Sequence, residues 1–432
     1  MKHSQLLTRH DTLLLRGLAI LLIVVHNFAH WLPGCVDENE YTWSGARLDH
    51  LWHVLQDGGP HILLNLFSHY GHYGVAIFLF LSGFGLTRKY EMGLGSNRSN
   101  TNYNGLGNHE GHGSNRSNAN FNCPGSLESR GESIPVLGFL RQHAGKLWHL
   151  MLPAVVVFYV VGLFVPNTPH YEWNAVVELL TFTVNLNPHR PMLLGPWWWF
   201  SLMMQFYIVW RLFVYRRSDR ALGLLTLVCL ALQLWTTWLS LGQLDNSSCV
   251  MTWLHYNMPC SMLPFALGVY VARHPATRLL HPALSLPALV VVVLGSWNVW
   301  VWPLGGVMSV IALVPLIQWA CHGHCRQDDS TTESSNTKNS TTESSNTENG
   351  TTEGSCTEDA GLGARLLSPL AWVGGISAWV FALHPVVRHA TIGMARQPGA
   401  EPYMAFVLYL TLSLLAGWLF TTLDKRCSQR AR

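Results

Sequence analysis

Charged side chains are scarce in this sequence, and their scarcity excludes an ordinary soluble enzyme. Only 12% of the 432 residues are charged, while 49% are hydrophobic. Soluble globular domains carry about 25% charged residues. We therefore expect lipid to be the main solvent of the chain, with the bilayer as a partner and no nucleic acid.

The cysteines lack the spacing of a disulfide framework. The CHGHC group at 321–325 has side chains that bind zinc, but it lacks a recognised zinc spacing. We interpret it as a segment at the membrane edge and expect no metal. A signal-peptide cleavage site is lacking too. Lys2 and Arg9 precede an apolar run over 12–32 with no small-residue site after it, so we predict a retained first helix.

Apolar runs long enough to span a bilayer recur along the chain. A transmembrane helix needs about 20 mostly apolar residues. The runs and the breakers between them predict about ten such helices, with boundaries soft by several residues. They lie at about 12–32, 70–87, 147–166, 196–215, 221–241, 257–273, 284–301, 303–321, 368–389 and 402–423.

The distribution of Lys and Arg supports this count. If the N-terminus is cytoplasmic, the inward segments hold most of these residues, and the outward segments hold only Arg47, Arg190, Arg388 and Arg396. Cytoplasmic loops are rich in Lys and Arg. The predicted fold class is therefore all-α integral membrane: a bundle of about ten transmembrane helices with cytoplasmic N- and C-termini.

Two polar insertions divide the predicted membrane domain. Residues 93–131 and 329–358 are rich in Gly, Ser, Asn and Thr, and each contains an internal repeat. Such segments cannot bury enough apolar surface to offset the entropy of ordering, so we predict disordered cytoplasmic loops. The membrane domain then comprises 1–92 with the first two helices, 132–328 with the third to eighth, and 359–432 with the last two and a basic tail.

Polar side chains form a stripe on the first predicted helix. At about 100° per residue, Arg16, His26, Asn27 and His30 fall on one arc. Ionisable groups within a bilayer are costly and usually face the bundle interior. His26 is therefore a candidate proton acceptor. Arg16, closer to the inner surface, either faces the interior or snorkels to the headgroups.

Further histidines fall at a similar predicted depth. His384 precedes Pro385 in the ninth helix, and histidine suits proton transfer near neutral pH. His69 and His72 stand at the outer mouth of the second helix, where we interpret them as contacts with lipid headgroups.

Three tryptophans open the fourth predicted helix at its outer end: Trp197, Trp198 and Trp199. Tryptophans at this depth predict an aromatic belt facing the lipid headgroups. They would alternatively serve as a stacking surface for a sugar ring.

Several short motifs occur in the order found in the acyltransferase-3 family of membrane acyltransferases, which the chain resembles over nearly its whole length except the insertions. The motifs are RGLAI at 16–20 with His26, GV at 74–75 with FLFLSGF at 78–84, FLR at 139–141 with Lys146 and Pro153, Trp198 with QFY at 205–207, LPFALG at 263–268, and GIS at 375–377 with His384 and Pro385.

The sequence departs from the family pattern at three places. The spacing between Arg16 and His26 is one residue shorter than in many members. Ala76 stands where many members carry an acidic residue. Met203 and Met204 stand where many carry a pair of glutamates.

The resemblance implies an acyl-CoA donor, usually acetyl-CoA, and a carbohydrate hydroxyl as acceptor. It places the family's arginine and histidine on Arg16 and His26. We predict a multi-pass O-acyltransferase of the bacterial inner membrane that moves an acyl group from cytosolic acyl-CoA to a cell-envelope polysaccharide or glycolipid. The alternatives are a transporter or exporter of a glycan or lipid-linked precursor, and a non-catalytic membrane component of a polysaccharide synthesis complex.

The candidate site residues divide by role. His26 and His384 are the candidate proton acceptors, and Asn27 or Ser82 would donate to the oxyanion. The acceptor would contact Trp197, Trp198, Trp199 and His72. Basic side chains that positive-inside topology alone also explains would meet the phosphates of acyl-CoA: Arg16, Arg88, Arg141, Lys146 and Arg211.

Overall fold

The computed structural model is all-helical in the part of the chain that it describes. This part comprises residues 7–35, 43–59, 61–93, 135–165, 173–187, 194–241, 253–322, 362–397 and 401–430. Within these ranges every regular element is a helix and none is a strand. The all-α class is therefore confirmed. Apart from Gly93, the two predicted insertions lie outside the described residues.

Seven stretches of the described chain are long and apolar enough to cross a bilayer. They are formed by α1 (Arg9–Ala29), α3 (Ile62–Tyr70) joined through the 3-10 turn η1 (Gly71–Tyr73) to α4 (Gly74–Tyr90), α5 (Val136–Gly162), α8 (Asp219–Leu241), α12 (Gly305–His322), α13 (Leu362–Ala395) and α14 (Pro402–Arg430).

The three other expected spans coincide with shorter helices. These are α7 (Trp198–Val209), α10 (Met258–Arg273) and α11 (Ser285–Ser296). The 3-10 turn η4 (Gly195–Trp197) leads into α7, and the π-helical turn η5 (Trp210–Val214) follows it. Every expected segment is thus helical, and the total of ten spans stays a prediction.

The structure also contains helices that hydropathy does not predict. α2 (Gly45–Asp57) and α6 (Trp173–Leu180) have 13 and 8 residues. Hydropathy does not predict them because a membrane-spanning helix needs about 20 apolar residues. The second span also begins earlier than expected, at Ile62 rather than near residue 70. The reason is that α3 runs through η1 into α4 with little interruption, so the histidines there lie within helical structure.

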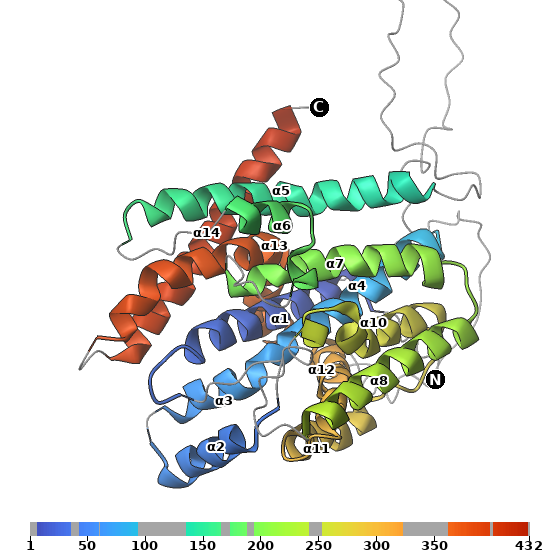
Figure 1. Ribbon diagram of the computed structural model, residues 1–432, viewed down its shortest axis with the longest axis horizontal. Coiled ribbons are helices and arrows are strands. Elements are labelled where there is room, and N and C mark those ends of the chain that lie inside the picture. The colour runs from blue at the N-terminus through green and yellow to red at the C-terminus, as the bar shows by residue number, and fades with distance from the viewer. Residues whose placement is uncertain are drawn as a thin grey trace, which may run out of the picture.

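α1 lies in the middle of the bundle, with α13, α4 and α3 beside it (Figure 1). Glycines allow α1 and α13 to approach closely. A Cβ on Gly17 would collide with the backbone oxygen of Leu370, and one on Gly374 with that of Leu13. Without a hydrophobic driving force in lipid, such small-residue contacts are a main source of helix association.

A similar reciprocal contact joins α4 to α10. A Cβ on Gly83 would collide with the backbone oxygen of Phe265, and one on Gly268 with that of Phe80. α1, α4, α10 and α13 therefore form a tightly packed centre. α5 and α8 lie on opposite sides of it in Figure 1.

An ionic cluster joins the ends of α4, α8 and α10. Arg273 lies 2.8 Å from Glu91 and 3.0 Å from Asp219, and it also donates to the backbone oxygen of Val214 at 2.9 Å. Truncating one member of a largely buried ion pair is strongly destabilising. Arg273 thus has a structural role where these three helices meet, in addition to its contribution to the charge asymmetry.

Candidate functional site

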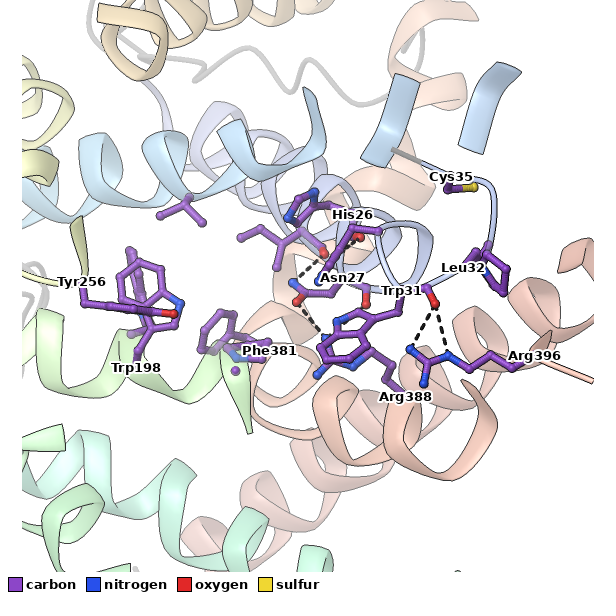
Figure 2. Close-up of a pocket in the computed structure, with 17 residues that line it drawn as sticks. His26, Asn27, Trp31, Leu32, Cys35, Trp198, Tyr256, Phe381, Arg388 and Arg396 are labelled. Atoms are coloured by element: carbon purple, nitrogen blue, oxygen red, sulfur yellow. Dashed lines mark hydrogen bonds between the residues drawn. The ribbon is translucent and has the colours of Figure 1, made fainter. Parts of the chain in front are cut away.

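A cavity of about 620 Å³ opens beside the C-terminal end of α1. We call it the outer cavity. Figure 2 shows His26 and Asn27 of α1 facing Arg388 of α13, with Trp198, Tyr256 and Phe381 at the far end. The polar stripe predicted on the first helix supplies three of its lining side chains, His26, Asn27 and His30.

His26 is held in one orientation by the backbone of α3. Its side chain is buried, and Nδ1 lies 2.8 Å from the backbone oxygen of Ser68. A carbonyl oxygen can only accept, so Nδ1 donates and the lone pair of the neutral ring is on Nε2. The carbonyl of Ser68 thus performs the orienting task that a carboxylate performs in a His–carboxylate pair. This contact fits a chain that carries Ala76 and Met203 where many family members have acidic residues.

Gly71 makes that close contact sterically possible. A Cβ on Gly71 would lie 2.7 Å from the Cβ of His26 and from the backbone oxygen of Leu22. Carbon atoms pack at about 3.5–4.0 Å, so only glycine fits here without moving α1. The turn that follows α3 is thereby packed directly against His26.

Other imidazoles cluster around His26. The ring centroids of His30 and His72 lie 4.8 Å and 5.7 Å from that of His26. We expected His69 and His72 to contact lipid headgroups, but the structure buries both of them, because η1 tucks this turn against α1. Even so, no group of three or more His, Cys, Asp or Glu side chains in the described part of the chain could hold a metal ion.

His72 lines a smaller cavity of about 90 Å³ next to the outer one, not the outer cavity itself. The two cavities share Val75 and Trp198. Gln233 and His255 face the smaller cavity as well. His72 could therefore contact an acceptor only in this smaller cavity, and that contact stays a proposal. The His72 ring itself lies next to the ring of His26.

Arg388 connects α13 to Asn27. Its guanidinium donates to the backbone oxygen of Asn27 at 3.1 Å and to the side-chain oxygen at 3.2 Å. The Asn27 amide nitrogen donates to the backbone oxygen of Ile23 at 2.9 Å. Trp31 lies between two cations, with Arg388 and Arg396 at 5.1 Å and 5.2 Å from its ring centroid. These contacts, seen in Figure 2, hold the mouth of the outer cavity together.

A second cavity, of about 400 Å³, lies beside the N-terminal half of α1. We call it the inner cavity. Arg16 and Lys146 line it with exposed side chains, together with Ser82, Tyr207 and Ser377. Arg16 therefore faces a space inside the bundle, as the polar stripe predicts. Of the two interpretations of Arg16, the structure favours this one over snorkelling.

Three of the five basic residues expected to meet acyl-CoA line neither cavity. Arg88 lies 6.0 Å from the ring centroid of Phe84, and Arg211 lies 4.8 Å from that of Tyr215. Arg141 is an exposed residue of α5, about one and a half turns before Lys146. Helical periodicity explains the difference, because Arg141 and Lys146 are five residues apart and point to different sides of α5.

The three tryptophans do not form the belt that the sequence suggests. Trp197 and Trp198 are buried, and the indole nitrogen of Trp197 donates to the backbone oxygen of Ala382 at 3.0 Å. Trp198 and Trp199 line the outer cavity, whereas Trp197 does not. Because η4 turns the chain inward before α7, two of these rings face the cavity and the third ties α7 to α13.

His384 is completely buried and lines neither cavity. Its Nδ1 lies 2.9 Å from the backbone oxygen of Phe381 and 3.1 Å from that of Val380. Its Nε2 has no hydrogen-bond partner among the described residues. The ring of Phe381 stands 5.7 Å away, between centroids. His384 is thus placed behind Phe381 rather than at the surface of the site.

Sequence reasoning missed several lining residues of the outer cavity. It treated Arg388 and Arg396 only as outward charges, and it did not single out Phe381 or Tyr256. A signal for Arg388 was available, since it lies four residues after His384 and so on the same face of the helix. Phe381 and Tyr256 are ordinary apolar positions in the sequence, and only the packing of α13 and the turn before α10 brings them to the cavity.

Comparison with known proteins identifies the family. The acyltransferase-3 family model, described as an acyltransferase domain, matches residues 13–422. The chain therefore belongs to this acyltransferase family, and the resemblance found in the sequence is confirmed. No curated protein and no solved structure matches it. With its long apolar helices, the chain is a multi-pass membrane protein of an acyltransferase family.

Proposed function

We propose that this protein is an O-acyltransferase of the bacterial inner membrane, with both termini in the cytosol. It takes an acyl group, acetyl by preference, from cytosolic acyl-CoA and transfers it to a hydroxyl of a cell-envelope polysaccharide or glycolipid. Family membership supports acyl transfer. The Lys and Arg distribution supports the orientation.

The observation that carries the proposal is the pairing of two cavities along α1. The inner cavity presents Arg16 and Lys146, and the outer cavity presents His26 with its ring oriented by Ser68. Arg16 and His26 are ten residues apart, which corresponds to about 15 Å along a helix. One cavity thus suits a donor with phosphates, and the other suits an acceptor that must lose a proton.

In the donor cavity, Arg16 and Lys146 would hold phosphate oxygens through charge-assisted hydrogen bonds. The cavity volume of about 400 Å³ suits the pantetheine arm and its thioester rather than the whole of CoA. Ser82 and Ser377 lie on its wall, where hydroxyls can orient the thioester. The nucleotide part of CoA would then stay at the membrane surface.

In the acceptor cavity, His26 would act as general base through Nε2. It takes the proton of the acceptor hydroxyl as that oxygen attacks the thioester carbonyl carbon. The tetrahedral intermediate then expels the CoA thiolate, which receives the proton that His26 took, so the base is regenerated. The products are an O-acyl ester and free CoA. Asn27 and Arg388 are the nearby donors for the developing oxyanion.

The test is a comparison of envelope glycans from cells with and without this protein. Base-labile acyl esters would be measured by mass spectrometry, and CoA release from acetyl-CoA would be followed in membranes from the same cells. We expect both signals to depend on the protein. Glycans that carry the same acyl esters in both strains would contradict acyl transfer. Altered glycan export with unchanged acylation would support the transporter alternative.

A further inference from the structure

Two aromatic side chains form a shared wall between the cavities. Trp199 of α7 and Phe381 of α13 are the only residues found in the linings of both the outer and the inner cavity among the described residues. Their ring centroids lie 5.9 Å apart with planes at 57°. We call this pair the aromatic septum. Figure 2 shows Phe381 between Asn27 on one side and Trp198 and Tyr256 on the other.

The backbones that carry the septum are fixed to each other. The bond from Trp197 to the backbone oxygen of Ala382, at 3.0 Å, joins the residue two before Trp199 to the residue after Phe381. Phe200 also packs against Phe381, at 6.0 Å between ring centroids. A displacement of α7 relative to α13 would break these contacts. Rotation of the two rings about their side-chain bonds would open a passage without breaking these contacts between the backbones.

Trp199 has more freedom than its neighbours. Trp197 and Trp198 are buried, and Trp199 is only partly buried because it borders empty space on both sides. Its other ring contact toward the inner cavity is with Phe78, at 6.2 Å. The attraction between two aromatic rings at this spacing is weak, so thermal motion can separate them.

We propose that Trp199 and Phe381 form a gate that separates the acyl-CoA side of the site from the acceptor side and admits only a small acyl group. An apolar constriction excludes water and ions by dewetting, so the closed gate separates the thioester in the inner cavity from the water and the base His26 of the outer cavity. The separation of two aqueous cavities follows from the geometry alone. The passage of an acyl group rests on the proposed function.

A labelling experiment tests the separation without any need for enzyme activity. Cys35 lines the outer cavity and serves as the native reporter there. Ser82→Cys places a reporter in the inner cavity. Intact cells would be treated with a membrane-impermeant methanethiosulfonate, and modification at each position measured by peptide mass spectrometry. We expect reaction at position 35, slowed because burial raises the pKa of the Cys35 thiol to about 11, and protection of position 82 while the septum is intact.

Removing a septum ring should connect the two cavities. In Ser82→Cys combined with Phe381→Ala, modification at position 82 should rise about tenfold, while modification at position 35 stays the same and reports an intact fold. Tyr207→Ala is the matched control, because Tyr207 is an aromatic residue that lines only the inner cavity, and its ring contacts are with Phe139 and His143. It should leave position 82 protected from outside.

Other labelling results would overturn the gate. Substantial modification at position 82 with the septum intact would do so, and so would continued protection in both Phe381→Ala and Trp199→Ala. If position 35 reacts only in inverted vesicles, the orientation of the protein in the membrane is reversed. Modification at position 82 with and without Phe381→Ala is then compared in inverted vesicles, and that comparison tests the gate.

Acyl selectivity provides the second arm of the test. One methylene in an apolar pocket is worth about 10–200-fold in selectivity. Phe381→Ala should therefore raise the rate ratio of propionyl to acetyl transfer at least about tenfold, and also raise acetyl-CoA hydrolysis without acceptor. Suppose that Phe381→Ala exposes position 82 to the reagent but the wild-type protein transfers no acyl group. This result would refute the proposed function and still support the separation of the two cavities by the septum. If Phe381→Ala exposes position 82 but leaves the propionyl-to-acetyl rate ratio unchanged, the gate does not select the acyl group by size.

Discussion

The two cavities are lined by the same central helices but hold their polar groups in opposite ways. The inner cavity exposes Arg16 and Lys146, two long side chains with many rotamers. The outer cavity presents His26, a short and buried side chain whose Nδ1 is held by the backbone carbonyl of Ser68. A mobile cation can follow a flexible phosphate ligand, whereas a base must stand at one position relative to the proton that it removes.

This difference predicts that the two cavities respond differently to substitution. Changes in the outer cavity should alter the rate of the chemical step. Changes in the inner cavity should alter the affinity for acyl-CoA. Kinetic parameters distinguish these outcomes, because loss of uniform binding raises KM while loss of an interaction made only in the transition state lowers kcat.

The largest effect is expected at His26. His26→Gln keeps hydrogen bonding but cannot cycle a proton at neutral pH, so kcat for acyl transfer should fall by about 10²–10⁴-fold. Acyl-CoA KM should change little. The measurement is CoA release together with the acyl content of the glycans, at matched membrane levels of protein.

Two other histidines sharpen this result. His30→Gln is the matched control, because His30 lines the same cavity and stacks on His26. It should cost about tenfold or less. His384→Gln should also cost less than His26→Gln, since His384 lines neither cavity. An active His26→Gln protein with an inactive His384→Gln protein would move the base to α13.

The next largest effect is expected from a change that touches no reacting group. Gly71→Ala would push its Cβ against His26 and the backbone of α1. A misplacement of about 1 Å can cost about 10²-fold in rate, so kcat should fall by up to that factor with acyl-CoA KM unchanged. The assay is steady-state kinetics beside a thermal unfolding measurement.

Gly85→Ala provides the control for Gly71→Ala. Gly85 lies within α4, the helix that follows η1, and a Cβ on it would meet nothing within 4 Å. This variant should keep wild-type kinetics and unfold at the same or a slightly higher temperature, because alanine favours a helix interior more than glycine does. A Gly71→Ala protein with full activity would show that His26 does not depend on the packing of η1.

The smallest effect is expected in the inner cavity. Arg16→Gln should raise the KM for acyl-CoA about tenfold, the equivalent of about 1.4 kcal/mol of lost binding. Lys146→Gln should act in the same direction. Arg141→Gln is the control, because Arg141 lines neither cavity. If Arg141→Gln raised KM as much as Arg16→Gln, the donor would bind along the basic face of α5 instead.

The sequence by itself determined the class of fold and the helices that build it. A bilayer solvates only apolar side chains and internally bonded backbone. Each membrane helix can therefore be predicted from its own run of apolar residues, without knowledge of the helices packed against it. The polar stripe with Arg16 and His26 was readable for the same reason, because it follows from the period of one helix. Short helices such as α2 and α6 lack that signal.

Only the tertiary structure decided how those helices combine into a site. The carbonyl that orients His26, the burial of His72 and the septum of Trp199 and Phe381 each join segments far apart in the chain. Such contacts depend on how closely the helices approach, as at Gly71. Periodicity gives the face of a helix but not the partner that packs against it, because packing is set by the shapes of both surfaces together.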